Sequence, residues 1–260
     1  MTGIDLHLHT TYDHGVSTPE EMVNEAIEKR MDCLGICVHA HDAANDSWVA
    51  KRSTMVRLLE EVGRLREKYT HELWILAGAE ADYFCDCSLK GFDYVIGSVH
   101  WFEFDGAYYP VDHSAEGLRE TAERFTGGDL IALAEKYYEM VGSVVEKTGA
   151  DIIGHFDLIT KFNEGGKLFD EQDPRYKAAW KAAADKLLKT GKPFEINTGA
   201  MSRGYRLSPY PSKEIRDYLH ENGGKLLLSS DAHSKDHLMH MFEQYEAETD
   251  PEAYDFLQEL

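Results

Sequence analysis

Residues 4–10 read IDLHLHT, an alternation of apolar and polar side chains that predicts a β-strand. A strand sends residues i and i+2 to the same face, so His7 and His9 share one side while Leu6 and Leu8 take the other. Two neighbouring imidazoles can bind one cation. An H-x-H pattern on its own is better accounted for by chance and a nearby hydrogen bond. The rest of the chain therefore decides between these interpretations.

The composition limits the classes of function. The chain has 260 residues, is 43% hydrophobic and carries a net charge of -20 at pH 7. This charge argues against a broad nucleic-acid or anionic-membrane surface, which would need clustered Lys and Arg. We therefore expect no nucleic-acid partner and no membrane partner. An anionic substrate would need a local positive field, for which bound metal is the obvious source.

The length suits one large α/β domain spanning residues 1–260. No uninterrupted apolar run reaches the roughly 18 residues of a membrane span, and the first residues lack the basic and then apolar plan of a signal peptide. We therefore expect a cytoplasmic protein. The cysteines, Cys33, Cys37, Cys85 and Cys87, give no disulfide framework and lack the partners of a four-cysteine zinc site, so free thiols are expected.

Strand and helix patterns alternate along the chain. Seven apolar runs bounded by turn residues predict strands at residues 3–9, 33–39, 73–80, 92–100, 150–155, 193–197 and 225–231. Helical periodicity covers residues 19–30, 47–69, 129–147, 174–190 and 211–222, and the first of these helices begins with a capping box, Thr18 to Glu21. This order favours right-handed β-α-β units and a parallel sheet, either closed as a barrel or open and doubly wound.

Polar residues of one chemical kind gather where these strands end. Six of the predicted strands end in, or run into, His, Glu or Asp: His7 and His9, His39, Glu80, His100, His155, and Asp231 with His233. Parallel barrels build their active sites at the carboxyl ends of the strands, so these side chains should meet at one rim. Imidazole and carboxylate without thiolate suit Zn, Mn or Fe in a hydrolytic centre. Because one ion needs fewer ligands, we expect a cluster of two or three divalent metal ions.

These motifs resemble those of a known family. HLH at 7–9, the following His14, His39, GAE at 78–80, IGSVH at 96–100, IGHFD at 153–157 and SSDAH at 229–233 are similar, in the same order, to motifs of the polymerase and histidinol phosphatase (PHP) superfamily. The likeness runs from residue 3 to about 235. Within the superfamily it is strongest to the bacterial histidinol-phosphate phosphatases, on DYVIGSVH at 93–100 and EINTG at 195–199 with PYPS downstream.

The resemblance implies a distorted (β/α)7 barrel and a metal-dependent phosphatase that hydrolyses L-histidinol phosphate in histidine biosynthesis. It also implies three metal sites. The implied ligands are His7, His9, Glu80 and Asp231 for the first, a bridging Glu80 with His100 and His155 for the second, and His14, His39 and His233 for the third. One departure concerns the strand-two ligand. The family often has Asp immediately before that histidine, where this chain has Val38, and a further candidate, His41, stands two residues beyond His39.

Such a constellation would hydrolyse a phosphate monoester. Two metals can share a water, lower its pKa to about 7 and supply hydroxide, and Asp231 or His233 could donate a proton to the leaving group. Lys161, Arg203 and Arg206 are candidate phosphate ligands, although each is equally well interpreted as a surface cation. The aromatic side chains of the insertion at residues 101–117 could form a lid or pocket wall, or could simply pack against the barrel mouth, and its His113 is ambiguous.

Other classes of function fit less well. An amidohydrolase barrel also opens with H-x-H but uses a bridging lysine at the end of strand four, where this chain has His100. A proofreading exonuclease is disfavoured by the net charge of -20. A metal-binding domain without activity is disfavoured because every implied ligand position carries a ligating side chain. The main alternative is a PHP phosphoesterase acting on another small phosphate ester.

Overall fold

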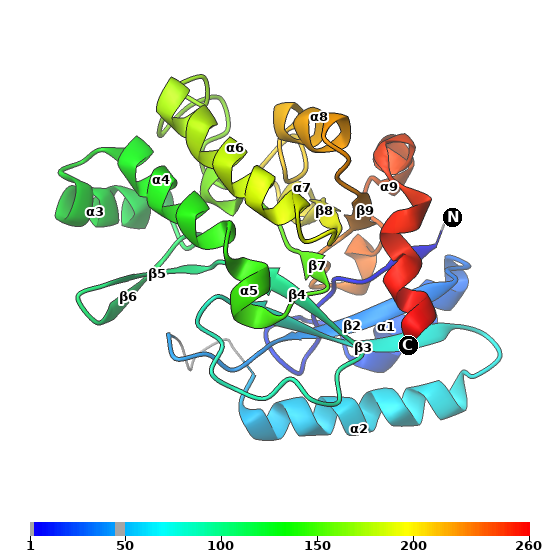
Figure 1. Cartoon of the computed structure of the whole chain (residues 1–260). Coiled ribbons are helices and arrows are strands. Elements are labelled where there is room, and N and C mark those ends of the chain that lie inside the picture. Colours follow the sequence, from blue (N-terminus) through cyan, green and yellow to red (C-terminus); the bar gives the residue numbers. More distant parts are fainter. Residues whose placement is uncertain (1–2, 45–49) are drawn as a thin grey trace.

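The computed structural model describes residues 3–44 and 50–260. Its centre is a sheet of seven parallel strands, each paired with the next in the order β1-β2-β3-β4-β7-β8-β9 (Figure 1). The strands are β1 (Ile4–Asp5), β2 (Cys33–His39), β3 (Trp74–Asp82), β4 (Tyr94–Ser98), β7 (Ile152–Ile153), β8 (Phe194–Asn197) and β9 (Leu226–Ser229). All seven predicted strands are therefore confirmed, although β1 and β7 are much shorter than their apolar runs.

The sheet curves until its first and last strands meet, so the predicted distorted barrel is confirmed. The join between β1 and β9 has no regular ladder; Leu8 pairs with Ala232 in one isolated bridge. Asp5 replaces part of the missing ladder, because its carboxylate accepts from the backbone N–H of Ser230 at 3.1 Å. Side chains thus close the barrel where the backbone ladder stops.

Helices cover the outside of the barrel. Figure 1 shows α2 along one side of the sheet and α4, α6 and α8 on the other. The α-helices are α1 (Pro19–Glu28), α2 (Arg52–Lys68), α3 (Ala115–Thr126), α4 (Leu130–Val141), α5 (Val144–Thr148), α6 (Pro174–Leu188), α7 (Gly199–Ser202), α8 (Lys213–Glu221) and α9 (Phe242–Tyr245). The capping box predicted at Thr18 and Glu21 is present. None of the described helices is long and apolar enough to cross a membrane.

Three expectations about the helices differ from the structure. Strand and helix do not alternate throughout, because residues 83–93 connect β3 to β4 without a helix. The helix predicted at residues 129–147 is two helices, which separate at Gly142 where α4 packs so closely on α6 that a Cβ would lie 3.2 Å from Ala183 Cα. Residues 47–49 of the predicted helix 47–69 lie outside the described residues, and α2 begins at Arg52.

The barrel interior is filled below the carboxyl ends of the strands. The ring of Tyr94 is buried against β2 and β3, and a Cβ on Gly35 or Gly78 would lie within 2.5 Å of its hydroxyl, so only glycine fits there. The 3-10 helix η4 (Pro251–Glu259) contributes Tyr254 and Leu257 to the same apolar cluster. The polar end of the barrel is therefore the opposite one.

An antiparallel hairpin projects beside the barrel mouth. It consists of β5 (Trp101–Phe104) and β6 (Ala107–Pro110) and lies at the left of Figure 1, next to α3. Of the alternatives for this insertion, the structure realises the pocket wall in part. Phe104 stacks on Phe125 of α3 at 4.2 Å between ring centroids, while Trp101 and Pro110 line the cavity at the barrel mouth.

Candidate metal centre

The residues predicted at the strand ends converge on one another. His39 and Glu80 stand opposite each other in the register of β2 and β3, and His39 Nδ1 lies 2.9 Å from Glu80 Oε2. Glu80 also faces histidines that follow β1, β4 and β7. The centre therefore collects side chains from almost the whole length of the chain, from His7 to His233.

The first group is His7, His9 and Glu80. His7 Nε2 and His9 Nε2 are 3.2 Å apart, and they lie 3.3 Å and 3.2 Å from Glu80 Oε2. Two ligands on one tetrahedral zinc, with bonds near 2.0 Å, are about 3.3 Å apart. Asp231 Oδ1 approaches the same nitrogens at 3.8 Å and 3.7 Å. The spacing of these atoms thus fits a single four-coordinate ion.

The hydrogen bonds behind these rings determine which nitrogen faces the centre. His7 Nδ1 donates to Glu195 Oε1 at 2.7 Å, and His9 Nδ1 donates to Asp13 Oδ2 at 2.6 Å. In the neutral tautomers, both Nε2 atoms then carry lone pairs that point at each other and at the Glu80 carboxylate. Such an arrangement is repulsive without a cation, and it is the usual outer sphere of a metal-binding histidine.

The two carboxylate oxygens of Glu80 face different histidines. Oε1 accepts from the Ser98 hydroxyl at 2.8 Å and lies 2.9 Å from His155 Nε2 and 3.4 Å from His100 Nε2. Oε2 faces His7, His9 and His39 but has no hydrogen-bond partner within the described part of the chain, although it is buried. A carboxylate placed in this way can bridge two cations.

A third group lies toward the solvent. His9, His14, His39 and His233 place one nitrogen each within 4.8 Å of one another. His14 Nε2 and His233 Nε2 are 2.7 Å apart, and the rings of His14 and His39 have centroids 4.9 Å apart. His9 therefore belongs to the first group and also borders this one.

The buried carboxylates of the centre favour positive charge on the groups around them. Burial lowers the pKa of His9, but the Asp13 carboxylate outweighs it and raises that pKa to about 9. Burial likewise opposes the charge of His100, and Glu80 raises its pKa to about 9. At the solvent side, burial and the neighbouring histidines lower the pKa of His14 and His233 to about 3, so both rings are neutral. Metal cations bound among these groups would be stabilised by the same carboxylates, Asp13 and Glu80.

Asp231 follows β9 in a constrained conformation. Its φ of 46° lies in the left-handed region, and a Cβ on Gly199 would lie 2.7 Å from its Cβ. Despite burial, the Arg203 guanidinium, 3.0 Å from Oδ2, holds the pKa of Asp231 well below its usual range. The ionised form favours a ligand over a proton donor. Strained backbone of this kind is common at functional sites.

Three carboxylates behind the histidines were not predicted from the sequence. Asp13 accepts from His9 and from the backbone N–H of His39 at 3.0 Å. Asp82 accepts from the backbone N–H of His100 at 2.6 Å. Glu195 accepts from His7 and from the backbone N–H of His155 at 3.0 Å. Two had a readable signal. Asp82 shares a face of its strand with Glu80 at i+2, and Glu195 is an acid within an apolar strand.

The structure also places the two alternatives for the strand-two ligand. His39 is the histidine that faces Glu80, while His41 Nδ1 lies 2.7 Å from the exposed Asp86 on the β3–β4 loop. Val38, at the position of the family's aspartate, is buried in the apolar cluster under α1 and α2. The chain supplies Asp13 instead as the carboxylate beside His39.

The three candidate phosphate ligands lie in different surroundings. Lys161 and Arg203 line the cavity at the barrel mouth, and Arg203 also contacts His233 Nδ1 at 2.8 Å. Arg206 is buried and donates to the carbonyl oxygen of Thr160 at 3.1 Å; it is not among the residues that line this cavity. Its part in phosphate binding stays a prediction.

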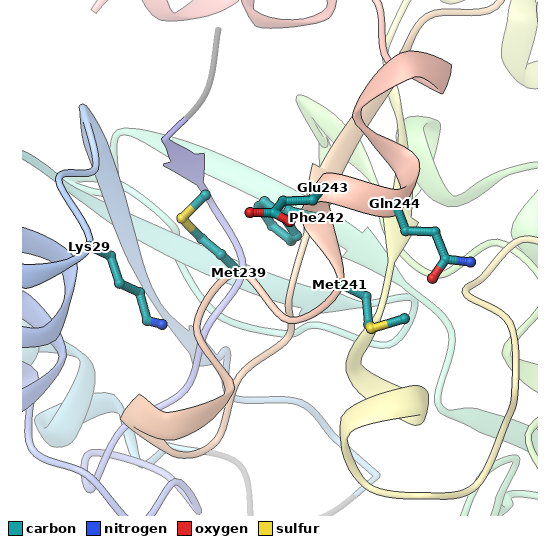
Figure 2. A pocket seen from close by; sticks show the side chains of 6 residues that line it. All are labelled: Lys29, Met239, Met241, Phe242, Glu243 and Gln244. Carbon is teal, nitrogen blue, oxygen red and sulfur yellow. The ribbon is translucent and has the colours of Figure 1, made fainter.

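The cavity above the centre has a volume of about 800 Å³. Its floor is formed by His14, His39, Glu80, His100, His155, Asp231 and His233, and its walls by Trp101, Pro110, Asp112, His113, Leu158, Lys161, Arg203 and Tyr205. The ambiguous His113 thus lies in the wall. A second cavity of about 740 Å³ lies between Lys29 and the C-terminal segment and is lined by Met239, Met241, Phe242, Glu243 and Gln244 (Figure 2). Its lining contains no histidine and no cluster of ligands.

The remaining histidines and the cysteines take no part in the centre. His71 and His220 lie near the ends of α2 and α8, and His237 and His240 lie beyond β9. All of the cysteines are free, as expected; Cys85 Sγ and Cys87 Sγ are 3.7 Å apart on the β3–β4 loop.

Known proteins resemble this chain over most of its length. The PHP domain family matches residues 5–199, which include every strand from β2 to β8. The chain belongs to the PHP domain family. A Schizosaccharomyces pombe protein assigned as a histidinol-phosphatase is 26% identical over 243 residues, covering 85% of this chain and 76% of that protein. The histidinol-phosphatase of Bacillus subtilis is 24% identical over 266 residues, covering 93% and 97%.

Two solved structures share this PHP fold. A Listeria monocytogenes protein assigned as a histidinol phosphatase superimposes with a TM-score of 0.78 at 23% identity, over 93% of this chain and 99% of that one. The histidinol phosphate phosphatase of Lactococcus lactis, complexed with Zn, L-histidinol and phosphate, gives a TM-score of 0.67 at 18% identity, over 95% and 92%. At these identities the likeness shows the fold.

Proposed function

We propose that this PHP protein is a metal-dependent phosphomonoesterase that hydrolyses L-histidinol phosphate to L-histidinol and phosphate. The observation that carries the proposal is the set of histidines around Glu80. Their ring nitrogens and the oxygens of its carboxylate converge below one open cavity. The relatives named as histidinol-phosphatases support the substrate. The enzyme would act in the cytoplasm as a single domain over residues 1–260.

The donor atoms would hold two or three divalent ions. His7, His9, Glu80 and Asp231 would bind the first, Glu80 with His100 and His155 the second, and His14, His39 and His233 the third. Zinc is favoured because the Lactococcus lactis relative carries it, and Mn or Fe would fit the same ligand types. When bound, such ions supply a nucleophilic hydroxide at neutral pH and neutralise charge on the phosphate.

The chain's own cations would orient the phosphate. Arg203 is held by Asp231 and His233 at the edge of the cavity floor, and Lys161 stands in the wall with its side chain 13% exposed. A planar guanidinium and an ammonium together would fix the ester oxygens above the metal ligands. Asp231 is held ionised by Arg203, so of the two predicted proton donors it would act mainly as a ligand.

Metal analysis and a substrate panel test this proposal. The purified protein should contain two to three equivalents of Zn, Mn or Fe and should hydrolyse histidinol phosphate with a higher kcat/KM than other small monoesters. The panel also contains a phosphodiester and single-stranded DNA. Faster cleavage of DNA or of the diester would contradict the monoesterase, and preference for another monoester would contradict only the substrate.

A further inference from the structure

The wall of the catalytic cavity carries an ion pair that faces the space above the metal ligands. Lys161 Nζ lies 2.9 Å from Asp112 Oδ2 and donates at 3.0 Å to the Asp112 carbonyl oxygen. Both residues line the cavity, and their side chains are 13% and 24% exposed. Both charges are therefore accessible to a molecule bound there.

Asp112 is held rigidly at this place. It follows β6 by two residues, and the preceding Val111 is buried and donates its backbone N–H to the His100 carbonyl oxygen at 2.8 Å. Lys161 is held from the other side, because its ammonium lies 4.9 Å from the centroid of the Tyr205 ring. Such restraint lowers the entropy cost of binding a ligand between the two groups.

Among the described residues, Asp112 belongs to none of the groups that could hold a metal ion. Three carboxylates line the cavity within the described residues, and the other two, Glu80 and Asp231, face the histidines. Burial opposes ionisation of Asp112, but the Lys161 cation outweighs it and lowers the pKa to about 2. The wall therefore presents one fixed negative charge that the proposed hydrolysis of a phosphate ester does not require.

We propose that Asp112 is the subsite for an ammonium group on the alcohol portion of the substrate, so that the enzyme selects phosphate monoesters of amino alcohols. This inference rests on the proposed function and names the feature of the substrate that the cavity recognises. L-histidinol phosphate belongs to this class, because its amine stands one carbon from the carbon that bears the ester oxygen.

Binding would exchange partners within the ion pair. Lys161 turns to a phosphate oxygen, and Asp112 accepts from the substrate ammonium, so one internal ion pair is replaced by two and neither charge is left alone. An ester without the amine must also draw Lys161 away, but it leaves the Asp112 carboxylate without a counter-charge. The cost of one charged hydrogen bond corresponds to about 10- to 100-fold in kcat/KM.

Two matched substrate pairs measure this selection. The first is L-histidinol phosphate and its deamino analogue, 3-(imidazol-4-yl)propyl phosphate; the second is 2-aminoethyl phosphate and ethyl phosphate. The metal-loaded parent enzyme should prefer the amine in each pair by about 10- to 100-fold in kcat/KM. Asp112→Asn should reduce both ratios to within about threefold of one, because it removes the partner of the substrate ammonium and relieves the deamino esters of the carboxylate that they leave without a counter-charge.

Two further variants separate an ammonium subsite from a purely positioning role of Asp112. Lys161→Gln should slow all four esters alike, because it removes a phosphate ligand. Asp217→Asn removes a carboxylate paired with Lys213 at 2.7 Å on the exposed face of α8 and should change no ratio. If Asp112 only positions Lys161, Asp112→Asn will instead slow all four esters equally, and the proposal is wrong. Asp112→Ser provides the same comparison if the amide variant fails to fold.

The outcomes distinguish this inference from the proposed function. Turnover of histidinol phosphate without preference for the amine in either pair would overturn the subsite and leave the phosphatase intact. Preference for 2-aminoethyl phosphate over ethyl phosphate, abolished by Asp112→Asn, would support the subsite even if histidinol phosphate proved a poor substrate.

Discussion

Glu80 is surrounded by imidazoles where an ordinary buried carboxylate would have hydrogen-bond donors. His39, His7 and His9 lie 2.9 to 3.3 Å from one of its oxygens, and that oxygen has no hydrogen-bond partner among the described residues. Burial opposes its charge, but the histidines hold the pKa of Glu80 well below its usual range. At the scale of single residues, the centre depends on this ionised carboxylate and on the acids that orient the rings around it.

Glu80→Gln tests the bridging role. Gln is nearly isosteric but presents one neutral oxygen and an NH₂ group that repels a metal, so ions on both sides of the residue should be weakened together. We expect loss of metal from two positions, measured by plasma mass spectrometry, and a fall in kcat of more than about 100-fold. Glu139→Gln, on the exposed face of α4, is the matched control. Metal content and turnover like those of the parent would exclude a bridging Glu80.

Glu195→Gln tests the acids behind the histidines. Glu195 accepts from His7 Nδ1–H through one oxygen and from the His155 backbone N–H and Asn197 through the other. An amide must turn its NH₂ toward one of these donors, so the tautomer or position of a ligand is disturbed. We expect a loss of metal affinity of about 10- to 100-fold in competition with a chelator. Affinity within about twofold of the parent would show that Glu195 only fills space.

At the scale of elements, the hairpin β5–β6 connects α3 to the cavity. Phe104 stacks on Phe125, and Tyr109 contacts the same ring at 4.9 Å between centroids, while Trp101 and Pro110 at the base of the hairpin form part of the cavity wall. One part of the hairpin thus packs on α3, while its base forms part of the cavity wall. The sequence indicated both alternatives for the aromatic insertion, but its pairing with α3 depends on residues that were not predicted as a helix.

Phe125→Ala should loosen the hairpin without affecting the metal ligands. An aromatic pair contributes about 0.5 to 1.5 kcal/mol, so we expect KM for the phosphate ester to rise about two- to tenfold while kcat and metal content stay near the parent's values. Phe256→Ala removes a comparable ring near Tyr94, in the apolar cluster covered by η4, and should leave KM unchanged. An unchanged KM in Phe125→Ala would show that the packing of the hairpin on α3 does not affect substrate binding.

At the scale of the whole molecule, the centre ties together the ends of strands that pair poorly elsewhere. β1 and β7 have only two residues each in the ladder, and the segments that follow β1 and β9 meet in one isolated bridge, Leu8 with Ala232. Proposed ligands from both sides of this join face one another: His7 and His9 after β1, and Asp231 after β9. Bound metal should therefore hold the barrel closed.

Removal of metal should lower the thermal stability of the entire protein. An ion present at 100 times its dissociation constant contributes about 2.7 kcal/mol, which corresponds to about 5 to 10 °C in Tm for a chain of this size. We expect a chelated sample to melt at least that much lower, as one cooperative transition, and to recover when Zn is restored. Equal melting temperatures, with loss of metal verified by analysis, would contradict this role.

The stability of the metal-free protein should also depend on pH. The folded pKa of His9 and of His100 is raised to about 9, above the unfolded value, because Asp13 and Glu80 outweigh the effect of burial. Their contribution to stability is therefore complete below about pH 6.5 and is lost as pH rises through about 9. We expect the difference in Tm between the metal-loaded and chelated protein to widen from about pH 7 to about pH 9. A constant difference would show that these rings are not protonated in the metal-free state.

The sequence by itself determined the seven strands, their parallel order and the ligand types at their ends, because alternation, apolar runs and capping residues are local patterns. His7, His9, His39, Glu80, His100 and His155 could be named from their place at the ends of strands. Only the tertiary structure decided that His39 and not His41 faces Glu80, since that depends on the register of β2 against β3. It also decided the roles of Asp13, Glu195 and Asp112, which act through contacts with residues 26, 188 and 49 positions away along the chain. Such contacts leave no periodic signal, because they arise when curvature of the sheet brings separate loops to one end of the barrel.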